Sequence, residues 1–410
     1  MPKIDGERLL GDLRTLRSIG ASGTGVVRPA FSAKDMEARR WLEGRYREAG
    51  LEASIDGVGN VLGKSSNPGP ALLIGSHSDT QPTGGWLDGA LGVVYGLEVA
   101  RALAEDEATR GLAVDAISWQ DEESRFLGCL GSRSFCDLLP AEIEAAARDA
   151  DGVALADAIR EAGLEGAPRF ALEAGRYHGF LEAHIEQGPH LEADGNKIGV
   201  VSTIVGLRGI DMSFEGQQNH AGTTMMAGRK DAATALYEFA YRVNEEFPKA
   251  MGERSVWTMG RVSLHPGAVS IVPGRAELSL QFRDASTEVL DRFEAIVDRL
   301  VADINAKGKA TVSAERSRSP IAPTEMDASM RRHLAQAAEA HAPGKWVEMP
   351  SGAFHDAGIV SAVLDSAMLF IPSIGGISHD FAEDSHDADI VLGCQVLADG
   401  AAAILAQATA

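Results

Sequence analysis

The sequence predicts an α/β protein in which one folded unit is inserted into another. Up to about residue 205, apolar strand-like runs alternate with segments of helical periodicity, a pattern typical of a largely parallel sheet. From about Gly206 to Pro323 the order of elements changes, and beyond Pro323 the first pattern returns. A chain of 410 residues is long enough for two hydrophobic cores. The predicted domains are therefore residues 1–205 together with 324–410, and residues 206–323.

Apolar residues of the first domain predict alternating helices and strands. In chain order these are a helix over about 36–50, a strand at 71–74, a helix over 91–103 and a strand at 112–119. The helices have apolar residues three and four positions apart, whereas the strands are short continuous apolar runs. Because the carboxyl ends of parallel strands meet at one edge of a sheet, ligand groups are expected to gather there.

The inserted domain has the predicted order βαββαβ. Its strands are expected at 205–214, 255–262, 276–283 and 310–314, and its helices over 232–247 and 289–304. In the third strand, the even-numbered residues from Ala276 to Phe282 are apolar and the odd-numbered ones from Glu277 to Arg283 are polar. Four strands and two helices in this order form a ferredoxin-like unit. The segment Arg316–Pro323 is predicted to be the return linker.

Composition excludes several classes of partner. The net charge of −21 argues against nucleic acid and anionic membrane surfaces, although local arginines can still bind small anions. No apolar run approaches the roughly 18 residues of a spanning helix, the longest candidate being Ile198–Leu207, and the N-terminus has no apolar signal core. Three cysteines without a Cys-x-x-Cys pair suit a reducing compartment and do not suit a cysteine-ligated zinc. We therefore expect a cytoplasmic enzyme.

Imidazole and carboxylate side chains follow or end several of the apolar runs. His77 lies in Gly-Ser-His-Ser-Asp-Thr after the first strand, and Asp88 follows eleven residues later. The pair Glu122–Glu123 comes shortly after the second strand, and two further histidines, His184 and His379, occupy similar positions. Imidazole and carboxylate are suitable ligands for zinc and similar divalent ions. Of two adjacent glutamates, one can bind metal while the other transfers a proton, so the pattern predicts a metallohydrolase.

Each of these features has a simpler interpretation when taken alone. A His-x-Asp pair is commonly a hydrogen-bonded core pair, Asp-Gly is commonly a turn, and Glu-Glu is commonly solvated. Their joint occurrence after strand-like runs favours a metal site. His386, in a sequence that partly mimics the one around His379, is expected to be a surface residue at the start of the last helix. An NAD-binding function is excluded because no Gly-x-Gly-x-x-Gly joins a strand to a helix.

These motifs resemble those of the hydantoinase/carbamoylase-type amidases, a group that includes N-carbamoyl-L-amino acid amidohydrolases, β-ureidopropionases and allantoate amidohydrolases. They belong with the aminoacylases and carboxypeptidase G among the dinuclear zinc hydrolases. The resemblance extends from residues 25–32 to residues 375–379, and its motifs are, in order, GSHSDT, GGWLDGALG, QDEESRF, EAHIEQGP, NHAGTT and GGISH. It implies a zinc-exopeptidase-like catalytic domain with an inserted ferredoxin-like lid and dimerisation domain.

The resemblance further implies two divalent metal ions, with Zn²⁺ expected first and Mn²⁺ or Co²⁺ as alternatives. Asp88 would bridge the two ions. His77 and His184 would complete the ligands of one ion, and Glu123 and His379 those of the other. Two such ions can share a water molecule and lower its pKa.

The catalytic and substrate-binding roles are implied in the same way. Glu122 would be the general base, and Asp79 would hydrogen-bond the far nitrogen of His77 and so fix its tautomer. Gln187 would contact the amide end of the substrate. His220 would polarise the scissile carbonyl and support the oxyanion, and Arg283 would bind the substrate carboxylate through two hydrogen bonds.

Three positions depart from the family pattern. Ser270 replaces an asparagine that assists carboxylate binding, Phe354 replaces a glycine and Met225 replaces a proline. Ser270 and Phe354 are counted with the substrate-binding residues. All residues implied as metal ligands are retained, whereas residues implied to contact the substrate have changed. This combination suggests that the reaction is retained on an altered substrate.

The expected activity is metal-dependent hydrolysis of a linear C–N amide. The first candidate substrate is an N-carbamoyl amino acid, which would yield the amino acid, CO2 and ammonia. The alternatives are allantoate, another N-acyl acid as in an aminoacylase or dipeptidase, and a non-catalytic dimeric binding protein on the same fold. We also expect a homodimer, a carboxylate-bearing small-molecule substrate, and hinge motion near Gly206 and Pro323.

Overall fold

The computed structural model describes residues 1–316 and 320–408, so residues 317–319 of the predicted return linker lie outside the described residues. The chain divides into two compact units. Unit 1 comprises Met1–Ser202 and Met326–Ala410, and unit 2 comprises Thr203–Glu325. Unit 2 thus begins three residues before, and ends two residues after, the predicted inserted domain of residues 206–323.

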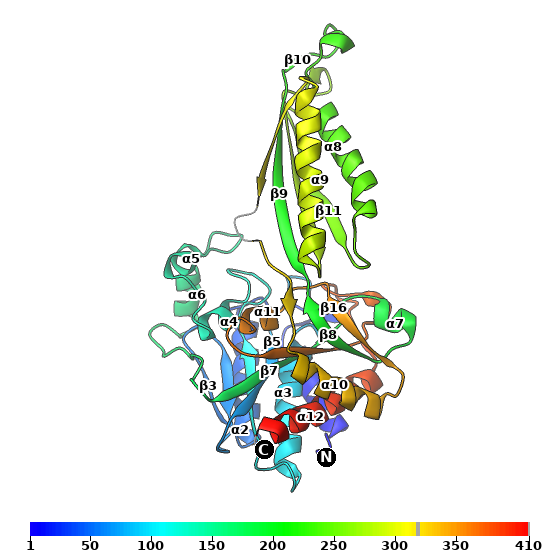
Figure 1. The fold of residues 1–410 in the computed structure, drawn as a ribbon. Helices are drawn as coiled ribbons and strands as arrows, with labels where there is room; N and C mark the ends of the chain where they lie inside the picture. The colour runs from blue at the N-terminus through cyan, green and yellow to red at the C-terminus, as the bar shows by residue number, and fades with distance from the viewer. Residues whose placement is uncertain (317–319, 409–410) are drawn as a thin grey trace. The chain divides into compact units, whose positions relative to one another are not determined.

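Unit 1 consists of a nine-stranded sheet with helices packed against it (Figure 1). Its strands outside the small β1–β2 pair are β3 (Glu52–Ile55), β4 (Val61–Lys64), β5 (Ala71–His77), β6 (Ala113–Trp119), β7 (Tyr177–Ile185), β8 (Ile198–Ile204), β16 (Trp346–Ser351) and β17 (Ser366–Ile371), with β15 (Thr324–Glu325) of unit 2 pairing with the end of β8. The pair is formed by β1 (Ala21–Ser22) and β2 (Gly25–Val26). The helices are α1 (Gly6–Ser18), α2 (Ala33–Glu48), α3 (Ala90–Glu105), α4 (Leu130–Phe135), α5 (Ala141–Ala146), α6 (Leu155–Glu161), α7 (His190–Asp194), α10 (Ala328–His341), α11 (Asp356–Val360), η3 (Ile374–Gly376) and α12 (Asp387–Ala408).

The sheet of unit 1 is mixed. Its order is β15-β8-β17-β7-β5-β6-β4-β3, with β16 paired to β8. The four central strands β17, β7, β5 and β6 are parallel, whereas β8, β4 and β3 run antiparallel to their neighbours. The expected largely parallel sheet is therefore confirmed for the centre and wrong for the flanks. The short connection between β3 and β4 allows an antiparallel neighbour, since a parallel pair needs a long crossover.

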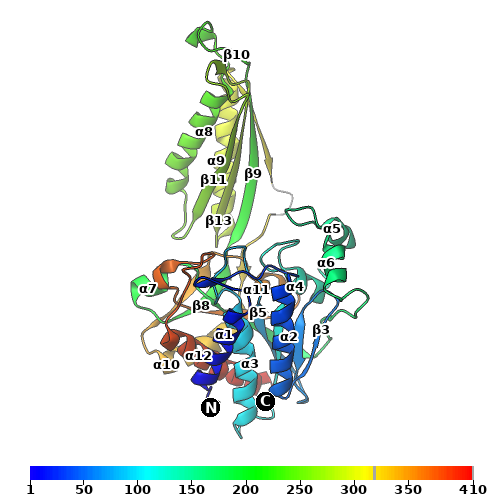
Figure 2. The ribbon, with the colours of Figure 1, turned by 180° about the vertical axis from the view of Figure 1, so that it is seen from behind.

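Helices cover the central strands, so β5 and β6 are buried along their whole length. The helix α3 packs on β5 and β6, and α12 packs on α3 and α10. Figure 2 shows α1 lying against α3. The short helices α4 and α11 contact each other and also touch strands of the sheet. This burial explains why the central strands are continuous apolar runs in the sequence.

The last helix corrects one expectation. Among the described residues, α12 is long and apolar enough to cross a membrane by length and composition, although the sequence analysis named Ile198–Leu207 as the longest candidate. In the structure, 72% of its most apolar window is buried inside the protein. Core helices of soluble proteins pass the same test, so the helix is explained by its packing on α3 and α10.

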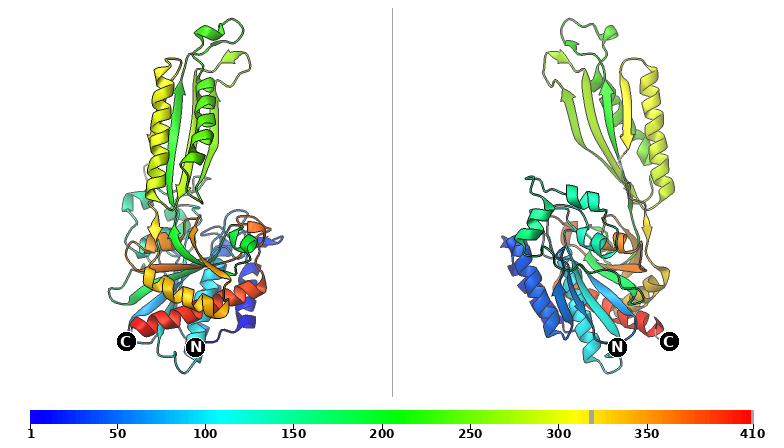
Figure 3. Two further views of the ribbon diagram at one scale, coloured as in Figure 1. Left: turned by 45° about the vertical axis from the view of Figure 1, so that its right-hand side comes forward. Right: turned by 90° about the vertical axis from the view of Figure 1, so that its left-hand side faces the viewer.

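Unit 2 is a four-stranded antiparallel sheet with two long helices, which lie beside each other on one face (Figure 3). Its elements are β9 (Gly206–Glu215), β10 (Asn219–His220), η1 (Met226–Gly228), α8 (Ala232–Glu246), η2 (Phe247–Lys249), β11 (Val256–His265), β12 (Ile271–Val272), β13 (Arg275–Asp284), α9 (Thr287–Ala306) and β14 (Thr311–Arg316). The sheet order β11-β13-β9-β14 confirms the predicted βαββαβ unit. The strands β10 and β12 form a separate small pair.

The strand β13 shows the predicted alternation. Its even-numbered residues from Ala276 to Phe282 are buried under the helices, and its odd-numbered residues face away from that core. One end of β13, at Arg275, pairs with Glu215 of β9, directly before the segment that forms β10. The other end, at Arg283, pairs with Leu207. Eight residues of strand separate these ends, a distance of about 27 Å.

Candidate metal centre

The candidate ligands come from strand ends at one edge of the unit 1 sheet. His77 is the last residue of β5, and His184 lies near the end of its parallel neighbour β7. Glu122 and Glu123 follow β6, and His379 follows β17. The carboxyl ends of all four central strands meet at the same edge, because these strands are parallel. The sheet topology therefore brings together side chains that are up to 302 residues apart, from His77 to His379.

Asp88 lies at the same edge of the sheet, directly before the N-cap residue of α3. Gly89 forms the N-cap of that helix with φ +63°, a conformation that favours glycine. A Cβ atom at Gly89 would lie 2.5 Å from ring atoms of His77, so no side chain fits there. The Asp-Gly pair thus lets the helix start approach the His77 ring closely and carry the Asp88 carboxylate with it.

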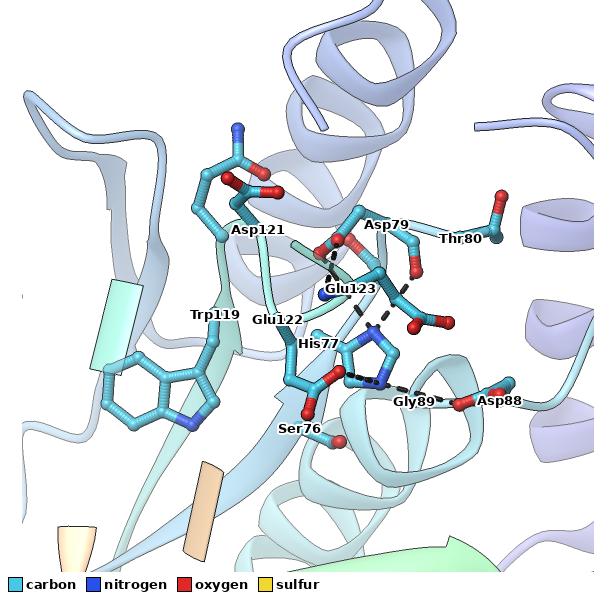
Figure 4. Close-up of polar contacts among 12 residues, drawn as sticks. Ser76, His77, Asp79, Thr80, Asp88, Gly89, Trp119, Asp121, Glu122 and Glu123 are labelled. Atoms are coloured by element: carbon cyan, nitrogen blue, oxygen red, sulfur yellow. Dashed lines mark hydrogen bonds and ion pairs between the residues drawn. The ribbon is translucent and has the colours of Figure 1, made fainter. Parts of the chain in front are cut away.

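The two oxygens of the Asp88 carboxylate face different side chains. Oδ1 lies 3.0 Å from Nε2 of His184 and 3.5 Å from Nε2 of His77. Oδ2 lies 3.2 Å from Nε2 of His379, which is itself 3.7 Å from Oε1 of Glu123. Two groups of possible ligand atoms result, His77–Asp88–His184 and Asp88–Glu123–His379, each within 4.8 Å. Figure 4 shows His77 pointing toward Asp88 and Glu122.

The ring nitrogens of His77 and His184 are oriented for ligation. Nδ1 of His77 donates to the main-chain carbonyl of Asp79 at 3.1 Å, and Nδ1 of His184 donates to the carbonyl of Ile185 at 2.9 Å. Once the proton on Nε2 has left, each neutral ring can present the Nε2 lone pair to a cation beside Asp88. Both rings are buried, whereas the His379 side chain is 51% exposed.

The Asp79 carboxylate does not form the expected hydrogen bond with His77. Its carboxylate Oδ1 lies 3.9 Å from Nδ1 of His77, beyond hydrogen-bond distance, so the tautomer is set by the Asp79 carbonyl. The carboxylate instead accepts the main-chain N–H of Glu123 at 3.2 Å and lies 3.7 Å from the buried guanidinium of Arg39. Asp79 therefore ties the end of β5 to the loop that carries Glu122 and Glu123.

Charge and burial set the protonation of the centre. Burial opposes ionisation of Asp88, but hydrogen bonds with three histidines outweigh it and hold its pKa well below the usual range. The hydrogen bond with Asp88 raises the pKa of His379 to about 9, and burial raises that of Glu123 to about 7. The protons on these groups must leave before a cation binds.

The donor set fits divalent cations. Imidazole nitrogens and carboxylate oxygens make up both groups, without a cysteine sulfur. Zn²⁺, Mn²⁺ and Co²⁺ all accept such ligands, and a single carboxylate with its oxygens turned to different groups can serve two ions. The residues therefore fit two divalent ions that share Asp88.

Glu122 lies beside this centre and outside both ligand groups. Its Oε2 is 3.7 Å from Nε2 of His77, and its side chain is 12% exposed. Burial, with the nearby carboxylates of Glu123, Asp356 and Asp88, raises its pKa well above the usual range. Such a carboxylate accepts a proton readily, as a general base requires.

Gln187 contacts the shared carboxylate. Its Nε2 donates to Oδ2 of Asp88 at 3.0 Å and to the hydroxyl of Ser378 at 3.2 Å. Its buried Oε1 has no hydrogen-bond partner among the described residues. Gln187 and His379 also have positive φ, of 56° and 54°, which is uncommon for residues other than glycine and recurs at functional sites.

Two positioning residues were missed by the sequence analysis. Glu383 is buried and accepts the main-chain N–H groups of Leu87 and Asp88 at 3.1 and 3.0 Å. The Ser378 hydroxyl lies 2.9 Å from Oε2 of Glu383 and 3.2 Å from Oδ2 of Asp88, and it donates its single proton to one of these carboxylates. Together they fix the turn that carries Asp88. Glu383 lies in a loop without periodicity, so no sequence signal distinguished it from other acidic loop residues.

A further histidine, His355, packs against His184 of the candidate metal centre. His355 is buried, with its ring centroid 4.7 Å from that of His184 and its Nε2 2.9 Å from the hydroxyl of Ser351. The preceding residue, Phe354, is half-buried and lies against Gly358, where a Cβ would come within 2.7 Å of the phenyl ring. Phe354, which differs from the family pattern, thus lies directly before the histidine whose ring packs against His184.

The predicted recognition residues of unit 2 do not gather at one point. His220 and Ser270 lie together, because His220 pairs with Ile271 and the main-chain N–H of Ala221 donates to the Ser270 carbonyl at 2.9 Å. Arg283 lies at the opposite end of β13, about 27 Å along the strand. The shared role of Ser270 and Arg283 in binding one carboxylate stays a prediction, and within a single copy the two residues do not lie together. The antiparallel strand separates them.

Arg283 is held on the open face of its sheet. Its guanidinium donates to Oε1 of Gln281 at 3.3 Å. Burial lowers the pKa of Arg283 from its usual value, although an arginine remains charged near neutral pH. A guanidinium can bind a carboxylate through two parallel hydrogen bonds.

Comparison with known proteins agrees with this geometry. Residues 73–403 match the model of the peptidase family M20/M25/M40. A solved amidase of the hydantoinase/carbamoylase family from Burkholderia phymatum is 51% identical, with a TM-score of 0.94 over 100% of this chain and 99% of that chain.

Curated relatives cover the same span. The N-carbamoyl-L-amino acid amidohydrolase of Geobacillus stearothermophilus is 32% identical over 96% of this chain and 97% of its own length. The allantoate amidohydrolase of Bacillus subtilis is 32% identical over 94% of both chains. The chain therefore belongs to the peptidase family M20/M25/M40, and its structural neighbours within that fold are amidases of the hydantoinase/carbamoylase type.

Proposed function

We propose that the protein hydrolyses N-carbamoyl amino acids to the amino acid, CO2 and ammonia at a centre of two divalent ions. The main observation in favour is the Asp88 carboxylate, whose two oxygens face two separate ligand groups. The similarity to amidohydrolases of linear amides over nearly the whole chain supports the reaction class.

Five residues would hold the ions. They are His77, Asp88, Glu123, His184 and His379. We propose Zn²⁺ as the native ion, with Mn²⁺ and Co²⁺ as alternatives for the same donors. When bound, such ions lower the pKa of water and offset negative charge that develops on oxygen.

The remaining roles belong to side chains of the protein. Glu122 accepts the proton of the attacking water and passes it to the departing nitrogen, a step that its raised pKa favours. Gln187 accepts an N–H of the substrate amide through its buried, unpartnered Oε1. His220 donates a hydrogen bond to the scissile carbonyl, and Arg283 binds the carboxylate.

The proposal includes a homodimer, which the positions of the recognition residues support. His220 and Ser270 lie at one end of the unit 2 sheet and Arg283 lies at the other, so one small substrate cannot reach both ends of the same copy. In this proposal His220 and Ser270 act on a substrate held by Arg283 of a second copy. A two-fold axis would then form two equivalent sites.

The proposed location is the cytoplasm. All three cysteines are free and buried, as expected where disulfides do not form. The strongly acidic charge agrees with a small-molecule substrate rather than a polyanion.

Allantoate is the second candidate substrate. It carries a carboxylate and ureido groups, and relatives named allantoate amidohydrolase are as similar to this chain as those named for N-carbamoyl amino acids. The changed residues Ser270 and Phe354 distinguish this chain from the family pattern and do not select between the two.

The test is release of ammonia and free amine by the zinc-loaded protein. The substrates are N-carbamoyl, N-formyl and N-acetyl L-amino acids, allantoate, and amides of the N-carbamoyl amino acids that lack a carboxylate. Preferred hydrolysis of an N-carbamoyl acid supports the proposal. Equal rates on the acids and on their neutral amides would contradict carboxylate binding by Arg283, and preference for allantoate would select the second candidate.

A further inference from the structure

The ring of His220 is held by the turn that follows it. The main-chain N–H groups of Gly222 and Thr223 both donate to its Nδ1, at 3.0 and 3.2 Å. A nitrogen that accepts two hydrogen bonds presents its lone pair, so the proton of the neutral ring lies on Nε2. Among the described residues of unit 2, none forms a hydrogen bond with that Nε2.

Arg229 braces this turn from the other side. Its Nε donates to the Thr224 carbonyl at 3.0 Å, and its Nη2 donates to the Ala221 carbonyl. The Ala221 carbonyl shares its peptide plane with the Gly222 N–H, so the guanidinium fixes that donor directly. The contact with the Thr224 carbonyl fixes the far end of the turn, after the Thr223 N–H. The Thr224 hydroxyl adds a hydrogen bond to the His220 carbonyl at 2.6 Å.

Gly222 allows the turn to approach the ring. A Cβ at this position would lie 3.2 Å from Cε1 of His220, closer than nearly all such contacts in proteins. Gly222, Thr223 and His220 itself are exposed, so apolar packing does not hold the ring in place. Its orientation depends on these hydrogen bonds.

We propose that the turn at residues 221–224, braced by Arg229, sets the tautomer of His220 and makes it a hydrogen-bond donor through Nε2. The inference rests on the proposed function, in which His220 meets the scissile carbonyl. A donor at that point stabilises the developing oxyanion, whereas a bare nitrogen would repel it. Arg229 is a positioning residue, since it acts on the substrate through the turn and His220.

The tautomer is measured by NMR on the zinc-loaded protein labelled with ¹⁵N at histidine. Two-bond ¹H–¹⁵N correlations distinguish Nε2–H from Nδ1–H rings, and the His220 signals are those lost in His220→Asn. The inference predicts the Nε2–H pattern, and a mixed pattern in Arg229→Ala. A predominant Nδ1–H pattern in the unchanged protein, or an unchanged pattern in Arg229→Ala, would overturn it.

The coupling is measured by kinetics. Arg229→Ala is expected to lower kcat by about 10- to 100-fold with little change in KM, because the lost contact acts in the transition state. In the His220→Ala background the same change should have almost no further effect, and Arg229→Lys should recover part of the loss. Lys230→Ala is the matched control, since this exposed neighbour donates no hydrogen bond to the turn.

Multiplicative losses from Arg229→Ala and His220→Ala would overturn the coupling even if the enzyme is active. If none of the substrates is hydrolysed, the proposed function fails. The NMR measurement still decides the tautomer in that case, so the two failures are distinguishable.

Discussion

The two units arrange their functional side chains in opposite ways. In unit 1, four candidate ligands from two strand ends and two loops lie around the carboxylate of Asp88, and Asp88, His77 and His184 are buried. In unit 2, the candidate recognition residues lie at both ends of β13, about 27 Å apart, and His220 and Ser270 are exposed. The candidate metal ligands thus meet within one copy, whereas the candidate recognition residues of unit 2 do not.

Sheet topology explains the difference. Parallel strands send all their carboxyl ends to one edge, so residues distant in sequence meet there. Antiparallel strands alternate, so successive loops fall at opposite ends of the sheet. The candidate residues of unit 2 therefore lie at both ends of its sheet.

The largest loss of activity and of bound metal is expected on substitution of Asp88. Asp88→Ala should abolish turnover and remove both ions, because this carboxylate faces both ligand groups. His379→Ala should remove only the ion on the Glu123 side. Metal content by elemental analysis, measured beside activity, distinguishes the two.

His386→Ala is the control for these variants. His386 is exposed and directly precedes α12, in a local sequence similar to that of His379. It should keep both ions and full activity. Loss of metal in this variant would mean that the wrong histidine was assigned to the centre.

The next largest effect on activity is expected at Glu122, and it distinguishes the role of Glu122 from that of Glu123. Glu122→Gln should lower kcat by about 10²- to 10⁴-fold while both ions remain, since only proton transfer is lost. Glu123→Gln should lose metal instead, because its carboxylate is part of a ligand group. Equal metal loss in both variants would show that the roles were assigned the wrong way round.

Zinc affinity should depend on pH between about 7 and 9. In the metal-free protein the raised pKa of His379, about 9, keeps its ring protonated below that pH, and binding must displace the proton. The pKa values of His77 and His184 are also raised, so affinity should rise by at least about tenfold per pH unit through this range. Competition titration with a chelating indicator measures the slope, and a flat profile would contradict the protonation of His379.

A smaller effect is expected at position 270. Ser270→Asn restores the family residue at the end of unit 2 where His220 lies. One added hydrogen bond to the substrate carboxylate should improve kcat/KM for ordinary N-carbamoyl-L-amino acids by about two- to tenfold. Unchanged kinetics would mean that the serine, or a water beside it, already fills this role.

The sequence predicted the features that depend on local pattern. Apolar runs placed β5 and β6, and His77 and Glu122–Glu123 followed because ligand groups occur after such strands. Alternation in β13 predicted the face that carries Arg283. The inserted βαββαβ unit followed from the change in the order of elements.

Features that depend on tertiary packing were missed. Glu383 and Ser378 act through contacts with the distant turn at Asp88, which no spacing reveals. The separation of Ser270 and Arg283 depends on strand direction and length, which the residue pattern alone does not give. The apolar helix α12 was overlooked because its charged residues interrupt a continuous run, while its buried face does not require one.

The most direct test of the divided site mixes two inactive variants. His220→Ala and Arg283→Ala proteins are each expected to lose nearly all activity as homodimers, although each keeps its metal ligands. After subunit exchange, half of the dimers would be mixed, and each mixed dimer would contain one intact site. Activity should then recover to about a quarter of the unchanged enzyme. No recovery, with exchange verified by mass spectrometry, would contradict the claim that recognition is shared between two copies.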